Sequence, residues 1–151
     1  MLMTDAKIQI KENNRSENIK LFFLGVGLIF VDQLSKNVVR LYDKGGFYIC
    51  NEGIGFGIKI PELIFFSLWT VAVIFLAHSV FLKKKYILRL ISCVFILSGA
   101  VSNMFDRFAH GCIIDFIDLK IWPVFNLADI FIVIGFAGFI YSIQKTKSFQ
   151  N

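Results

Sequence analysis

Two pairs of polar side chains in this sequence have the spacing and the chemistry of a catalytic site. Asn103 precedes Asp106 by three residues, and Asn126 precedes Asp129 by the same interval. Residues three apart lie on one face of a helix, so each amide is placed beside its carboxylate. Two neighbouring carboxylates cannot both ionise easily, and a pair sharing one proton can activate a water for attack on an amide bond. The spacing predicts an aspartic dyad of Asp106 and Asp129, provided that their helices meet.

The same carboxylates also have a structural interpretation. Asp106 could pair with its neighbour Arg107. Asp129 could stabilise the start of its own helix, where free backbone N–H groups favour a negative charge. Since carboxylates in ion-pair networks are also perturbed, the spacing alone leaves both interpretations open.

A further pair of ionisable residues interrupts the first apolar stretch of the chain. Asp32 and Lys36 are four residues apart, so they share a helix face and can form an ion pair. A charge at membrane depth costs several kcal/mol and usually marks function. A structural ion pair and a direct role toward substrate both remain consistent with this spacing.

The elements that must position these residues are membrane helices. Of the 151 residues, 56% are hydrophobic and 18% are charged, and the mean hydropathy is +0.68. Soluble domains are about 25% charged, so this composition excludes a soluble α/β fold, a coiled coil and a disordered chain. The net charge of +5 does not indicate nucleic-acid binding, because the basic residues lie between apolar runs.

Four apolar runs are long enough to cross a bilayer, which takes about 20 residues. The predicted spans are residues 19–39, 63–82, 86–105 and 124–143. The sequence therefore predicts an all-α membrane protein with one four-helix domain at 19–143, preceded by a tail at 1–18 and followed by a tail at 144–151.

The basic residues near the ends of these runs predict the orientation. Ten of the 16 lysines and arginines fall on one side of the four-span arrangement: Lys7, Lys11, Arg15, Lys20, Lys83, Lys84, Lys85, Arg89, Lys145 and Lys147. The positive-inside rule makes that side cytoplasmic, so both termini are expected there and the connections at 41–62 and 107–123 face outward. Asp106 and Asp129 then lie at the same depth, near the outer boundary.

The three cysteines are too few for a disulfide framework. Cys93 falls within the third predicted span, whereas Cys50 and Cys112 both lie in outer connections. The sequence favours unpaired thiols at these two positions and keeps a Cys50–Cys112 bridge as the alternative in an oxidising compartment.

Several motifs occur together in an order that resembles one family. They are DQLSK at 32–36, NEGIGF at 51–56, NMFDRFAHGCIIDFIDL at 103–119 and FNLAD at 125–129. The set resembles lipoprotein signal peptidase, the bacterial signal peptidase II family. This resemblance implies an aspartyl endopeptidase of the bacterial inner membrane, which cleaves diacylglyceryl-modified prolipoproteins on the N-terminal side of the lipidated cysteine.

By matched position, the resemblance implies that Asp106 and Asp129 are catalytic. It implies supporting or substrate-binding roles for a set of polar and glycine residues: Asn51, Gly53, Asn103, Arg107, Asn126, Asp32 and Lys36. The implied fold has four membrane helices, a small outer β-structure from the first outer connection and a short outer helix from the second. No metal or cofactor is implied. The implied partners are diacylated prolipoproteins and membrane lipid, with no nucleic acid, and the implied protein is a monomer with a site near the periplasmic face that globomycin inhibits.

Two other classes remain for a four-span protein with buried carboxylates. A small proton-coupled transporter could use them to carry protons, and Asp32 lies deep enough for that role. Asp106 and Asp129 lie at one boundary, which favours a peptidase. The remaining class is a membrane adaptor without chemistry, which would tolerate the loss of both aspartates.

Overall fold

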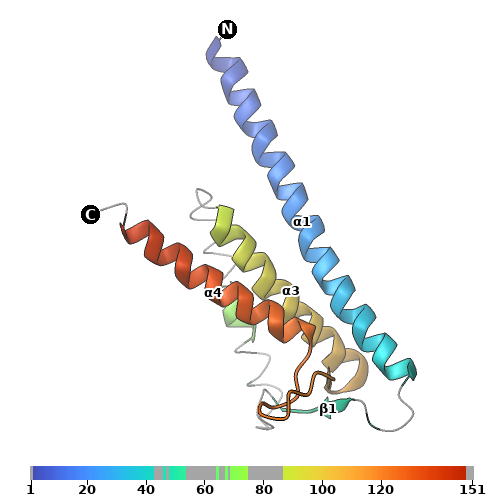
Figure 1. The fold of residues 1–151 in the computed structure, drawn as a ribbon. Helices are drawn as coiled ribbons and strands as arrows, with labels where there is room; N and C mark the ends of the chain where they lie inside the picture. Colours follow the sequence, from blue (N-terminus) through green and yellow to red (C-terminus); the bar gives the residue numbers. More distant parts are fainter. Residues whose placement is uncertain are drawn as a thin grey trace.

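The computed structural model describes residues 2–42, 46, 48–53, 64, 67, 69–74 and 87–148, with side chains described between residues 16 and 145. This part of the chain forms long helices and a small two-stranded sheet (Figure 1). The elements are α1 (Leu2–Tyr42), β1 (Ile49–Asn51), α3 (Ile87–His110), β2 (Ile113–Asp115) and α4 (Leu127–Ser148).

Three helices are long and apolar enough to cross a membrane: Ser16–Tyr42, Ile87–His110 and Leu127–Lys145. They confirm the first, third and fourth predicted spans. The predicted span at 63–82 lies largely outside the described residues, although residues 64, 67 and 69–74 are helical. Helix α1 has 41 residues and runs back through the predicted N-terminal tail, which contains no glycine or proline to interrupt a helix.

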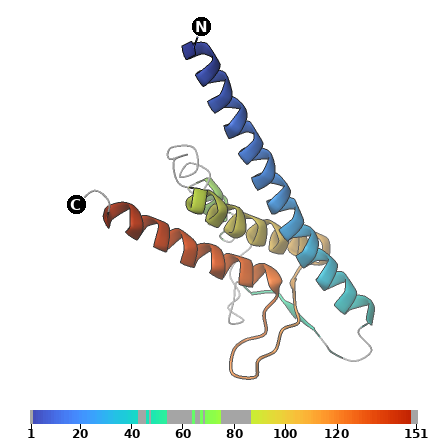
Figure 2. The same cartoon turned by 45° about the horizontal axis from the view of Figure 1, so that its top comes forward.

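Helices α3 and α4 pack along one another, and α1 crosses α3 and contacts the start of α4 (Figures 1 and 2). Glycines permit the close approach of α3 and α4. A Cβ atom on Gly99 would lie 2.3 Å from the carbonyl oxygen of Ala128, and one on Gly135 would lie 2.7 Å from the carbonyl oxygen of Ser92. The two helix backbones therefore meet where α4 begins, next to Asp129.

The two strands come from the two connections that the sequence predicts to face outward. β1 and β2 pair antiparallel, with Cys50 opposite Ile114 and Asn51 opposite Ile113. The prediction of a short helix in the second outer connection is wrong, because residues 111–126 contain no helix. Instead, this segment folds back on itself as a hairpin. The backbone N–H of Phe125 donates to the carbonyl of Ile117, and the backbone N–H of Ile117 donates to the carbonyl of Phe125.

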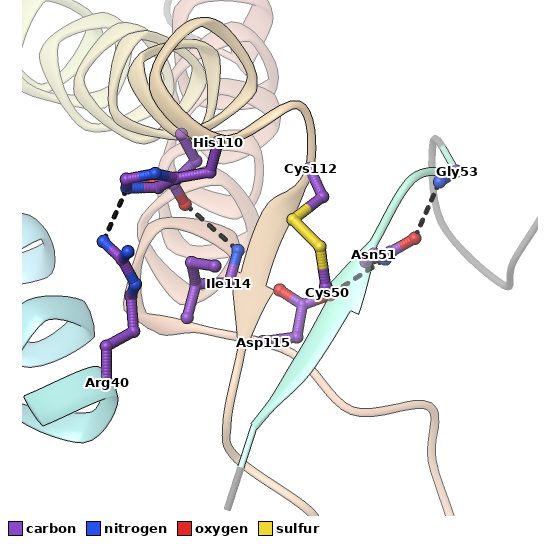
Figure 3. The surroundings of a disulfide bond; sticks show 9 residues. Arg40, Cys50, Asn51, Gly53, His110, Cys112, Ile114 and Asp115 are labelled. Atoms are coloured by element: carbon purple, nitrogen blue, oxygen red, sulfur yellow. Dashed lines mark hydrogen bonds between the residues drawn. A yellow bond between two sulfur atoms is a disulfide. The ribbon is translucent and has the colours of Figure 1, made fainter. Parts of the chain in front are cut away.

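A disulfide joins Cys50 in β1 to Cys112 just before β2 (Figure 3). The expectation of two unpaired thiols is therefore wrong, and the alternative holds. The strand register explains the pairing. Cys50 lies opposite Ile114, and Cys112 precedes Ile114 by two residues and so lies on the same face of the sheet. The two Cα atoms are 5.4 Å apart, within the range that a disulfide spans.

Candidate active site

The ammonium of Lys36 lies at the centre of a buried polar network between α1 and α3. Its Nζ is 2.7 Å from a carboxylate oxygen of Asp32 and 2.7 Å from one of Asp106. It also donates to Oδ1 of Asn103 at 2.8 Å. An ammonium has three protons, and here each has an acceptor. Lys36 and Asp32 are 2% and 0% exposed, so this is an internal ion-pair cluster and it confirms the predicted Asp32–Lys36 pair.

Asp106, which the sequence assigns to the dyad, is part of this cluster, and both of its carboxylate oxygens have partners there. Its Oδ2 contacts Lys36 and accepts from the backbone N–H of Ile114 at 3.2 Å, while its Oδ1 accepts from Nε2 of Gln33 at 2.8 Å. The residue is 1% exposed. In the described part of the chain, no hydrogen bond or ion pair joins Asp106 to Asp129.

Asp129 lies in the first turn of α4 and forms a reciprocal cap with Asn126. The backbone N–H of Asn126 donates to Oδ2 of Asp129, and the backbone N–H of Asp129 donates to Oδ1 of Asn126, each at 3.1 Å. This is a capping box, and it satisfies N–H groups that a helix start leaves free. Nδ2 of Asn103 donates to the other carboxylate oxygen of Asp129 at 2.9 Å. Asp129 is half-buried, so its carboxylate retains access to a reactant.

The second carboxylate beside this cap belongs to Asp115, the last residue of β2. Nδ2 of Asn126 donates to Oδ1 of Asp115 at 2.6 Å, and Nδ2 of Asn51 donates to Oδ2 at 2.8 Å. Asn126 thus holds Asp115 with its side chain and Asp129 with its backbone N–H. The structure brings Asp129 together with Asp115 through one shared residue.

The environment of Asp115 favours its protonated form. Burial raises the pKa of Asp115 to about 6, and the charge of Asp129 raises it as well. The hydrogen bonds from Asn51 and Asn126 and the charge of Lys36 act in the opposite direction. The charge of Asp129 therefore favours the neutral form of Asp115.

The remaining predicted site residues tie the outer segment to this pair. Oδ1 of Asn51 accepts from the backbone N–H of Gly53 at 2.9 Å, which fixes the orientation of the Asn51 amide. A guanidinium nitrogen of Arg107 in α3 donates to the carbonyl of Gly53. The predicted supporting residues therefore belong to one connected network. Residues 54–56 of the NEGIGF motif are not among the residues that the structure describes.

Comparison with known proteins identifies the chain. A family model described as signal peptidase (SPase) II matches residues 24–145. The chain belongs to the signal peptidase II family. The lipoprotein signal peptidase of Moorella thermoacetica is 37% identical over 126 residues, which cover 74% of this chain and 84% of that protein. That of Borreliella afzelii is 33% identical, and the match covers 87% of this chain and 94% of the relative.

The fold agrees with the family assignment. A solved structure described as a bacterial membrane enzyme superposes with a TM-score of 0.75 at 23% identity, covering 87% of this chain and 92% of that one. The signal peptidase II family consists of aspartic peptidases, so the chain is a membrane peptidase, and the transporter and adaptor alternatives are excluded.

Sequence reasoning missed three residues of this signal peptidase II site. Gln33 and Ser102 bond to each other and to the aspartates of the buried cluster. Asp115 was missed because it has no amide three residues away on a helix. The sequence did hold a signal for Asp115. It is an acidic residue that follows two apolar residues, within the motif at 103–119 that carries the resemblance.

Proposed function

We propose that this peptidase cleaves diacylglyceryl-modified prolipoproteins on the N-terminal side of the lipidated cysteine, with Asp115 and Asp129 as its catalytic dyad. One observation carries the choice of dyad: Asn126 donates hydrogen bonds to the carboxylates of both residues. The substrate class follows the names of the relatives, which are lipoprotein signal peptidases.

The two carboxylates have different roles in this proposal. Asp129 is the base, because it lies at the start of α4 and its carboxylate accepts from Asn103 and Asn126. Asp115 holds the proton, because burial raises its pKa to about 6. A water between them gives a proton to Asp129 and attacks the scissile carbonyl carbon, while Asp115 donates its proton to the developing oxyanion. Asp129 then gives its proton to the nitrogen of the leaving amine and Asp115 takes a proton back from a hydroxyl of the tetrahedral intermediate as the C–N bond breaks, which restores ionised Asp129 and protonated Asp115.

Asp106 has a positioning role in this proposal. It holds Ile114 one residue before Asp115 and anchors Lys36, whose ammonium also contacts Asp32 and Asn103. The sequence-based dyad of Asp106 and Asp129 remains the competing assignment. The contacts favour Asp115, because the carboxylate of Asp106 is paired with the ammonium of Lys36, whereas Asp115 and Asp129 share Asn126 as a donor.

The setting of the reaction follows from the charge pattern and the position of the site. We propose four membrane spans with cytoplasmic termini in the bacterial inner membrane, and a monomer that needs no metal, cofactor or nucleic acid. The dyad lies where α4 begins, beside the outer strands, which is the end of the helices opposite the basic flanks. Acyl chains of the substrate can then stay in the bilayer while the scissile bond reaches the dyad.

The test is cleavage of a purified diacylated prolipoprotein by Asp115→Asn, Asp129→Asn and Asp106→Asn variants, with and without globomycin. Loss of a proton-transferring group costs about 100-fold to 10,000-fold, so Asp115→Asn and Asp129→Asn should fall by at least the lower figure. Asp106→Asn should retain measurably more activity, since Lys36 keeps Asp32 as its anionic partner. Globomycin should block the wild-type reaction.

Thermal unfolding of each variant separates chemistry from folding. A folded Asp115→Asn variant with nearly wild-type cleavage would rule out Asp115 and return the dyad to Asp106. A folded Asp106→Asn variant that is as inactive as Asp129→Asn would do the same.

A further inference from the structure

The disulfide in the outer segment reaches a side chain that touches the dyad. We propose that the Cys50–Cys112 bond is a positioning element for catalysis, which holds Asn51 against the carboxylate of Asp115 (Figure 3). This inference rests on the proposed role of Asp115. It concerns a pair of residues that the signal peptidase II motifs of this chain leave without a role.

The strand that carries Asn51 pairs with β2 alone in the described part of the chain, whereas β2 is held against α3 through Ile114 and Asp106. β1 and β2 have three residues each, and they pair only with each other in the described part of the chain. The cysteines are separated by 62 residues, so the pairing closes a long loop. An isolated two-stranded sheet is marginally stable in water. The covalent bond therefore fixes a register that the strand hydrogen bonds alone hold weakly.

The bond acts on the residue next to it. Asn51 follows Cys50 directly, and Asp115 lies three residues after Cys112, so the bridge joins the two segments that meet in the Asn51–Asp115 hydrogen bond of 2.8 Å. On its other side, Asn51 is held through Gly53, whose carbonyl accepts from Arg107. Asn51 is thus held from both sides along the chain. Cys50 before it is covalently bonded to Cys112, and Gly53 after it is hydrogen-bonded to Arg107 of α3.

The hydrogen bond from Asn51 is one of several influences on Asp115. The charged groups facing Asp115 are Asp129 from α4 and Lys36 from α1, and the other amide donor is Asn126 at the start of α4. None of these three residues belongs to β1. Opening the disulfide removes the covalent restraint beside Asn51 and so weakens its hydrogen bond to Asp115, while Gly53 still holds the other end of the amide and the remaining groups around Asp115 stay in place. Because an N–H donor stabilises the ionised carboxylate, its loss raises the pKa of Asp115.

The experiment compares the bridged and opened forms of the full-length enzyme in prolipoprotein cleavage across pH. The bridge is opened in folded wild-type protein with a dithiol, which gives two electrons to the disulfide and becomes a cyclic disulfide while two protein thiols form. Cys50→Ser/Cys112→Ser provides the genetic equivalent. Cys93→Ala is the matched control, because Cys93 is a free cysteine buried in α3, away from the outer strands.

We expect kcat/KM to fall by about threefold to tenfold on opening the bridge, the effect of losing one hydrogen bond to a reacting group. The upper limb of the pH profile should move to higher pH, as it should in Asn51→Leu. In the Asn51→Leu background, opening the bridge should change kcat/KM by less than twofold. Cys93→Ala should respond to the dithiol as the wild type does.

Two results would overturn the inference. In the first, opening the bridge lowers the unfolding temperature but leaves the upper limb of the pH profile of kcat/KM unchanged. The bond would then stabilise the fold without positioning Asn51. The other is an equal loss of activity in the wild-type and Asn51→Leu backgrounds. Either result in an enzyme that Asp115→Asn inactivates leaves the proposed dyad intact, whereas an active Asp115→Asn variant rejects the dyad itself.

Discussion

The carboxylate of Asp32 in α1 accepts a hydrogen bond of 2.8 Å from the backbone N–H of Ala128 in the first turn of α4. The first N–H groups of a helix have no partner within that helix, and here another helix supplies one. The other oxygen of Asp32 accepts from Ser102 of α3 at 2.7 Å and contacts Lys36. One buried carboxylate therefore joins all three described membrane helices and sets the position from which Asp129 projects.

Replacing Asp32 should destabilise the protein strongly. Asp32→Ala leaves the N–H of Ala128 without its acceptor and removes one of the two anionic partners of the buried Lys36. Breaking a buried ion pair from one side costs about 3–5 kcal/mol, and the free energy of unfolding in detergent should fall by that amount. Asp118→Ala is the control, because Asp118 pairs with Lys120 at the surface. Equal losses in the two variants would contradict a bridging role for Asp32.

The pH profile should report the proton on Asp115. The active dyad carries one proton, and Asp115 loses it as the pH rises through its pKa, which burial raises to about 6. The upper limb of kcat/KM should therefore lie at or above about pH 6. Bound substrate excludes more water and raises this pKa further, so the upper limb of kcat should lie higher still. A rate that falls with decreasing pH through this range would instead make Asp115 the base.

Two roles of Asn126 should be separable by mutation: its oxygen caps α4, and its side-chain NH2 donates to Asn103 and Asp115. Asn126→Ala loses both and should lower the free energy of unfolding by about 0.5–2 kcal/mol, the usual range for a lost N-cap. Asn126→Ser keeps a good capping oxygen but has no amide to donate to Asn103 and Asp115. We expect Asn126→Ser to recover stability in thermal unfolding while cleavage stays as low as in Asn126→Ala. Recovery of both would mean that the cap alone matters.

The contact between α3 and α4 should not accept a methyl group at Gly99. The new Cβ atom would lie 2.3 Å from the carbonyl oxygen of Ala128, so the helices must separate beside Asp129. Overpacking of this kind costs about 1–3 kcal/mol, and Gly99→Ala should lower both the unfolding temperature and kcat. Gly27→Ala is the matched control, since nothing lies within 4 Å of a Cβ atom there. Its stability should be unchanged or slightly higher, because alanine favours a helix.

The sequence predicted the first, third and fourth spans, because an apolar run of membrane length is a strong and local signal. It predicted the Asp32–Lys36 pair for a similar reason, since a spacing of four on one helix fixes the geometry. The Cys50–Cys112 bond and the hairpin before α4 were not predictable in this way. Both depend on the register between strands from distant parts of the chain, which no local spacing encodes.

The candidate site shows the same limit. The spacing of three correctly predicted the contact between Asn126 and Asp129, whereas Asn103, with the same spacing from Asp106, donates to Asp129 instead. Asp115 was missed because it reaches the cap of α4 from a strand, through a turn that ends α3 at Gly111, whose φ of +75° suits glycine. Asp106 has the helical spacing, but Lys36 from another helix takes its carboxylate, and such long-range pairing becomes visible only in the folded chain.

The double use of Asn126 has a consequence for the order in which the enzyme is made. The residue that starts α4 also holds Asp115, so the dyad comes together only with the first turn of this helix. A nascent chain that has inserted α1 and α3 already carries Asp115, yet it has neither Asp129 nor the amide that aligns them. With the proposed dyad, proteolytic activity would therefore arise only when the final described helix inserts, and an unfinished chain would not cut its neighbours in the membrane.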